Sequence, residues 1–75
     1  MTPYKDIDND SGVRAYNIED GYIDVQFKDG ALYRYTSMSA GQANLEKMAR
    51  LARAGDGLNS FINRNVKQRY SARLR

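Results

Sequence analysis

The stretch VQFKDGALYRYT, residues 25–36, decides the fold of this 75-residue chain. It places Asp29-Gly30 between two runs of β-branched and aromatic residues, which is a strong short-range signal for a β-hairpin. A second pair, Asp20-Gly21, separates two earlier runs of the same kind. We therefore expect a three-stranded antiparallel meander over Val13–Ile18, Tyr22–Phe27 and Ala31–Thr36.

The length of the second loop sets which side chains of the third strand face the core. A two-residue loop would send Arg34 to the apolar face beside Val25, and burying an unpaired guanidinium is costly. A three-residue loop with Gly30 in the left-handed region instead turns two tyrosines inward. We expect this second arrangement, which pairs Phe27 with Ala31 and buries Tyr33 and Tyr35.

The middle strand alternates clearly, whereas the first strand does not. Ile23, Val25 and Phe27 share one face of the middle strand, which must be the core face. For the first strand two registers are acceptable, and they bury either Val13 and Ala15 or Tyr16 and Ile18.

Two helices are expected after the strands. Ser39 and Gln42 have the spacing of a capping box, which predicts a helix start at Ser39 and, with the C-cap signal of Gly55, a helix end there. Glu46 and Arg50 are expected to pair on its outer side. Its apolar stripe consists of Leu45, Met48, Ala49 and Ala52.

Asp56 is expected to cap a second helix that runs from about Leu58 to Lys67. The apolar stripe of this helix is Leu58, Phe61, Ile62 and Val66. The fold class predicted is therefore α+β, in the order β-β-β-α-α. Residues 1–12 are read as a loose N-terminal arm, with the alternative that Tyr4 and Ile7 fix part of it to the domain. Residues 13–70 are read as the single domain and residues 71–75 as a basic tail, and the chain is expected to fray over residues 69–75.

Composition argues against several classes of function. The chain contains no His and no Cys, so the usual proton-transfer residue and thiol nucleophile are missing and Cys/His zinc sites are impossible. Asp6, Asp8 and Asp10 alternate, but the Gly and Glu of a calcium loop are absent. We expect no enzyme activity, no metal and no cofactor, and a cytoplasmic location without membrane association, because no apolar run approaches the ~20 residues of a membrane span.

Charge is distributed unevenly along the chain. Residues 1–40 hold four basic and seven acidic side chains, net −3, whereas residues 41–75 hold eight basic and two acidic ones, net +6. Clustered Lys and Arg favour a nucleic-acid partner. The residues expected to bind RNA or DNA are Arg50, Arg53, Arg64, Lys67 and Arg69, with Ser60, Arg64 and Lys67 spaced to share one helix face.

The tyrosines suggest two further surfaces. Tyr22, Tyr33, Tyr35 and Tyr70 are candidates for stacking on bases, although Tyr33 and Tyr35 are expected to pack under the helices. The alternative function is a protein-interaction or homo-oligomerisation module that uses the outer sheet face. That face is expected to expose Tyr22, Leu32 and Arg34.

Several motifs resemble the KTSC family, which is named for a small domain at the C-terminus of some lysyl-tRNA synthetases. They are Ser11-Gly12-Val13 leading to Tyr16, VQFKDG at 25–30 followed by Tyr33-Arg34-Tyr35, and GLNSFIN at 57–63 running to Val66. The chain has Met38-Ser39 where family members often carry Val-Pro. The resemblance implies a β-β-β-α-α domain, commonly a whole small bacterial or phage protein, with no established catalytic role; its link to RNA is an analogy.

Overall fold

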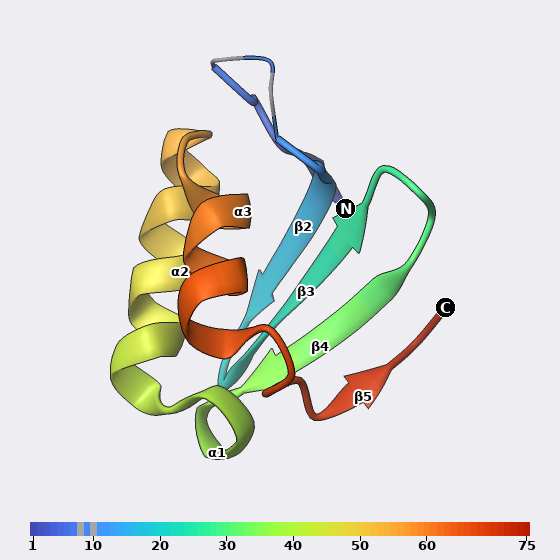
Figure 1. Ribbon diagram of the computed structural model, residues 1–75. Helices are drawn as coiled ribbons and strands as arrows, with labels where there is room; N and C mark the ends of the chain where they lie inside the picture. Colours follow the sequence, from blue (N-terminus) through green and yellow to red (C-terminus); the bar gives the residue numbers. More distant parts are fainter. Residues whose placement is uncertain (8, 10) are drawn as a thin grey trace.

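The computed structural model describes residues 1–7, 9 and 11–75. Its centre is an antiparallel sheet of five strands that lie in chain order, with the helical layer packed on one face (Figure 1). The α+β class is confirmed. The strands and helices are β1 (Thr2–Pro3), β2 (Val13–Glu19), β3 (Tyr22–Phe27), β4 (Leu32–Thr36), α1 (Ser37–Ala40), α2 (Gln42–Ala54), α3 (Leu58–Phe61), the π-helix η1 (Ile62–Val66) and β5 (Ala72–Arg73).

The predicted three-residue loop between β3 and β4 is confirmed. The N–H of Phe27 donates to the carbonyl of Ala31 at 2.8 Å, and Gly30 adopts φ +94°. Val25 lies opposite Tyr33 in the resulting register. Tyr35 is only 1% exposed, and Tyr33 is half-buried against the same core.

A β-bulge resolves the register of β2. The pairing with β3 shifts between Val13 and Ala15, so that Val13 lies opposite Phe27 while Tyr16 lies opposite Val25. Because a bulge adds one residue to one strand, the side chains on either side of it can share a face. Val13 and Tyr16 therefore both join the core, which neither of the two uninterrupted registers allows.

The two chain ends extend the sheet, so the prediction of a fraying tail is wrong, and the N-terminal arm is fixed at Tyr4 and Ile7, the alternative that the sequence left open. Thr2 and Pro3 pair with β2, and the next side chain, Tyr4, is 7% exposed within the core. Ala72 and Arg73 pair with β4. Each edge of the sheet is thus a two-residue strand, a length that discourages further strand addition.

The start of the helical layer differs from its prediction because the capping box lies three residues earlier. The Thr36 hydroxyl accepts from the N–H of Ser39 at 3.0 Å, and the Ser39 hydroxyl accepts from the N–H of Thr36 at 2.9 Å. Thr36 is therefore the N-cap of the short helix α1, and Ser39 supplies the second side chain of the capping box in place of Gln42. Gly41, with φ +95°, separates α1 from α2.

The core stripe of α2 is largely confirmed, with Leu45, Met48 and Ala52 buried and Ala49 half-buried. The expected pair of Glu46 and Arg50 is absent from the described chain; Glu46 accepts from the Gln42 amide at 3.0 Å instead. Gly55 ends α2 in the left-handed conformation, φ +73°, as predicted.

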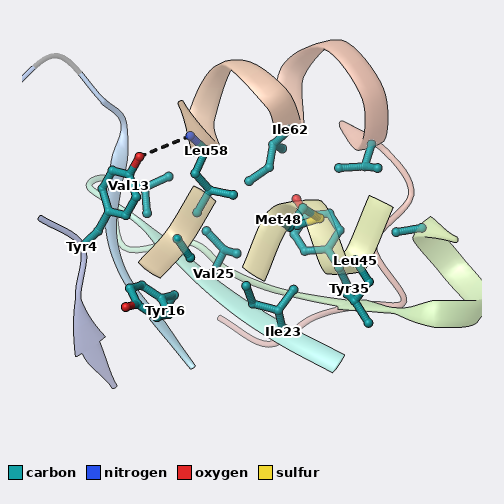
Figure 2. Packing of buried hydrophobic residues seen from close by; sticks show 13 residues of the cluster. Tyr4, Val13, Tyr16, Ile23, Val25, Tyr35, Leu45, Met48, Leu58 and Ile62 are labelled. Atoms are coloured by element: carbon teal, nitrogen blue, oxygen red, sulfur yellow. Dashed lines mark hydrogen bonds between the residues drawn. The ribbon is translucent and has the colours of Figure 1, made fainter. Parts of the chain in front are cut away.

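A tyrosine takes the place of the predicted Asp56 cap at the start of α3. The N-cap residue is Gly57, and no side chain of the N-cap satisfies the helix. The N–H of Leu58 donates instead to the hydroxyl of Tyr4 at 3.2 Å, across 54 positions of sequence (Figure 2). The N-terminal segment is therefore fixed both by its ring in the core and by its hydroxyl at a helix start.

The second predicted helix is two elements, α3 and η1. The stripe of Leu58, Ile62 and Val66 is buried as expected, and Phe61 packs against it half-buried. η1 has the wider turn of a π-helix, with i→i+5 bonding. Because the 3.6-residue period does not continue through η1, the single stripe argued for Ser60, Arg64 and Lys67 stays a prediction.

Candidate nucleic-acid interface

All five predicted cationic residues are exposed on the helical layer or just after it. Arg50 and Arg53 lie on α2, Arg64 lies on η1, and Lys67 and Arg69 follow η1 directly. Within residues 1–7, 9 and 11–75, none of these five side chains has an acidic partner within 4.0 Å. Their charges are therefore not neutralised by a close contact inside the described chain.

The structure divides these cations into two groups. Arg50 and Arg53 line an open groove of about 430 Å³ between α2 and the β2–β3 hairpin, and none of Arg64, Lys67 and Arg69 lines it. The same groove carries three acidic side chains, those of Glu19, Asp20 and Glu46. The three carboxylates would repel a polyanion at this groove, whereas no acidic side chain among the described residues lies within 4.0 Å of Arg64, Lys67 or Arg69.

A cluster of aromatic rings lies where the chain leaves this second group of cations. The Tyr70 ring centroid lies 4.7 Å from that of Tyr33 and 6.4 Å from that of Tyr35, nearly perpendicular to the latter. Phe27 meets Tyr33 edge-on at 5.8 Å. The guanidinium carbon of Arg73 lies 5.5 Å from the Tyr33 ring centroid. We call Phe27, Tyr33, Tyr70 and Arg73 the tyrosine ledge.

Sequence reasoning found the members of the ledge but not their assembly. Tyr70 was assigned to a fraying end, and nothing local to residues 69–75 marks a strand. The local sequence does not show that β5 pairs with the outer edge of β4. In this pairing the N–H of Ser71 donates to the carbonyl of Arg34 at 2.7 Å, and the N–H of Leu74 donates to the carbonyl of Leu32 at 2.7 Å. These bonds bring Tyr70 back over the core face.

The tyrosines of the ledge shape the ionisation of their buried neighbour. Burial raises the pKa of Tyr35 to about 12, and the nearby Tyr33 and Tyr70 add to the rise. Tyr35 is consequently neutral throughout the physiological range, and it supports the ledge from below as an uncharged ring.

The outer sheet face carries Tyr22 and Arg34 as predicted, but the structure engages both within the chain. Arg34 forms a bidentate salt bridge with Asp24, in which its Nε donates to Oδ1 at 2.8 Å and its Nη2 donates to Oδ2 at 3.0 Å. The hydrogen bond to Asp24 and the negative charge of its carboxylate raise the pKa of Arg34. Arg34 also lies 4.0 Å above the Tyr22 ring, and Leu32 is half-buried. Asp24 is 7% exposed, so this contact satisfies a buried carboxylate.

Metal ligation has little support in the part of the chain that is described. No group of three or more His, Cys, Asp or Glu residues there could hold a metal ion. Of the alternating aspartates, Asp8 and Asp10 lie outside the described residues. The carboxylate of Asp6 accepts from the N–H of Ser11 at 3.0 Å and pairs with Lys28 at 3.1 Å, so it shapes the chain before β2.

Among the described residues, no helix has both the length and the apolar character needed to cross a membrane. Comparison with protein-family models, with curated proteins and with solved structures finds no match to this chain. The KTSC resemblance therefore stays a prediction that rests on the motifs quoted above.

Proposed function

We propose that this chain is a non-catalytic, KTSC-like nucleic-acid-binding module whose main contact surface is formed by Arg64, Lys67 and Arg69. The observation that carries the proposal is that these three exposed cations have no acidic partner among the described residues and lead directly into the tyrosine ledge. Phosphate oxygens are the ligands that such cations contact in nucleic-acid complexes.

Charge at the level of the chain supports the same proposal. The eight basic side chains of residues 41–75 outnumber two acidic ones, and the chain as a whole has a net charge of +3. A cationic surface raises the association rate with a polyanion and supplies sequence-independent affinity. The absence of Cys suits a reducing compartment such as the cytoplasm, where nucleic acid is abundant.

The test is binding of fluorescein-labelled RNA and DNA oligonucleotides, measured by anisotropy from 25 to 300 mM salt. We expect measurable affinity at low salt that falls steeply as salt rises. Lys67→Gln should weaken binding to every sequence and reduce the salt slope by about 1, as the loss of one phosphate contact does.

The matched control is Arg53→Gln, which removes the same charge from the groove that also holds acidic residues. We expect a smaller loss of affinity for this variant than for Lys67→Gln. Absence of binding at the lowest salt, or equal affinity of wild type and the double variant Arg64→Gln/Lys67→Gln, would show that the proposed function is wrong.

A further inference from the structure

Tyr70 is flanked by backbone hydrogen bonds, although it lies in a connection between elements. Tyr70 stands between η1 and β5, where the N–H of Arg69 donates to Val66 at 2.9 Å and that of Ser71 donates to Arg34 at 2.7 Å. Figure 1 shows this connection crossing from the helical layer to the sheet edge. Backbone hydrogen bonds on both sides of Tyr70 order this segment before any ligand arrives, which reduces the entropy lost on binding.

The ring of Tyr70 is supported on its inner side and open elsewhere. The rings of Tyr33 and Tyr35 contact it, and yet the Tyr70 residue is 39% exposed. Tyr35, by contrast, is 1% exposed. Tyr35 therefore fills the core, whereas Tyr70 covers it. An exposed, immobilised aromatic surface is the feature on which unpaired bases stack in single-stranded nucleic-acid complexes.

Positively charged residues lie close to Tyr70 along the chain, and a nucleic acid is negatively charged. Lys67 and Arg69 lie within three residues of Tyr70 along the chain, and both side chains are exposed. Arg73 adds a third cation within the ledge itself, over the Tyr33 ring. A single strand can place its phosphates on such cations while one base turns onto the ring, whereas the bases of a duplex are already stacked on one another.

We infer that the tyrosine ledge binds an unpaired base by stacking on Tyr70, so that the ligand of this module is single-stranded nucleic acid. This inference rests on the proposed function and adds to it the ligand class and the residue that selects it. A protein ligand on the same ring is the competing outcome of the test, and it would leave oligonucleotide affinity insensitive to Tyr70.

The test compares a labelled 12-nucleotide oligothymidylate with a labelled duplex of the same length in wild type, Tyr70→Phe and Tyr70→Leu. Stacking of one base on an aromatic ring contributes ~1–3 kcal/mol, which corresponds to roughly 5- to 150-fold in affinity. We expect Tyr70→Leu to lose single-strand affinity within this range, Tyr70→Phe to stay within about twofold of wild type, and duplex affinity to be unchanged in both.

Two further measurements keep the outcome decisive. Circular dichroism and urea unfolding establish that Tyr70→Leu is folded, and its salt slope should equal that of wild type because no cation is lost. In wild type, the Tyr70 ring protons should shift upfield in NMR spectra as oligothymidylate is added. This second observation needs no variant.

The outcomes separate the inference from the proposed function. Equal affinity of Tyr70→Leu and wild type for the single strand, with unshifted Tyr70 protons, overturns the inference that Tyr70 stacks on a base. Salt-dependent binding through Lys67 still stands in that case. If neither the oligothymidylate nor the duplex binds at the lowest salt, the proposed function fails and the ledge inference fails with it.

Discussion

Gly55 is the residue on which three parts of the chain converge. It ends α2 with φ +73°, its carbonyl accepts from the N–H of Ile7 at 2.9 Å, and a Cβ placed on it would lie 2.5 Å from the Cβ of Lys5. The sequence predicted the helix end but not the close approach, because the packing of residues 5–7 on the interhelical turn depends on contacts distant in sequence.

Gly55→Ala should therefore destabilise the protein for two reasons, the left-handed backbone and the clash with Lys5. We expect a loss of roughly 2–4 kcal/mol in the free energy of unfolding, measured by urea denaturation. Gly21→Ala is the matched control, because Gly21 has φ +84° and no atom within 4 Å of the added Cβ. A loss at Gly55 no greater than that at Gly21 would show that Lys5 does not constrain this position.

Tyr35 provides a test of burial through pH. Its pKa is raised from an ordinary value of 10.0 to about 12 by burial, so the folded state holds a proton that the unfolded state releases first. The stabilisation is complete below pH 10 and is lost as pH rises from 10 through 12.

We expect the free energy of unfolding of wild type to fall across this interval, and that of Tyr35→Phe to fall less steeply. Urea denaturation at a series of pH values from 9 to 12 measures both slopes. Parallel slopes for the two proteins would mean that the Tyr35 hydroxyl ionises as readily in the folded state as in the unfolded one.

At the scale of elements, hairpins were predictable and termini were not. The β3–β4 register follows from local turn chemistry and from the cost of burying Arg34, and both are visible in twelve residues. β1 and β5 have two residues each, and their pairing exists only because β2 and β4 offer free edges. No sequence period is long enough to show such strands.

The predicted capping groups at both helix starts were wrong, although the second helix begins at Leu58 as predicted. Ser39 and Gln42 match the usual capping-box template, whereas Thr36 and Ser39 form the observed box with a hydroxyl in place of the expected carboxylate or amide. At α3 the group that satisfies the first turn comes from Tyr4. The bond from Leu58 to Tyr4 depends on the folded chain, whereas the Thr36–Ser39 box is local and differs from the template only in its second side chain.

The edge strand β5 is testable through one backbone bond. Leu74→Pro removes the N–H that donates to the carbonyl of Leu32 at 2.7 Å, while Leu74→Ala shortens the same side chain and keeps the N–H. We expect the proline variant to be less stable than the alanine variant by about 1 kcal/mol in urea denaturation. Equal stabilities would show that β5 contributes no net stabilisation through this bond.

At the scale of the whole molecule, charge and secondary structure separate together. Strands β1–β4, their loops and α1 belong to the half of the chain with net charge −3, and α2, α3 and η1 belong to the half with net charge +6. This polarity was predictable from composition. The division of the cations by the acidic groove was not, because it depends on where the β2–β3 hairpin meets α2.

The two faces of the sheet are therefore expected to differ in function. The outer face satisfies its own charges, with Arg34 held by Asp24 and stacked over Tyr22, while the helical side leaves its cations without acidic partners among the described residues.

Leu32→Gln alters the outer face without changing charge. We expect this variant to keep wild-type affinity for oligonucleotides and wild-type sedimentation in the ultracentrifuge, whereas Lys67→Gln weakens binding. If wild type instead sediments as a dimer that Leu32→Gln dissociates, the outer face is an interface between two copies of the chain. That result would support the alternative function, a homo-oligomerisation module, over a solvent-exposed outer face.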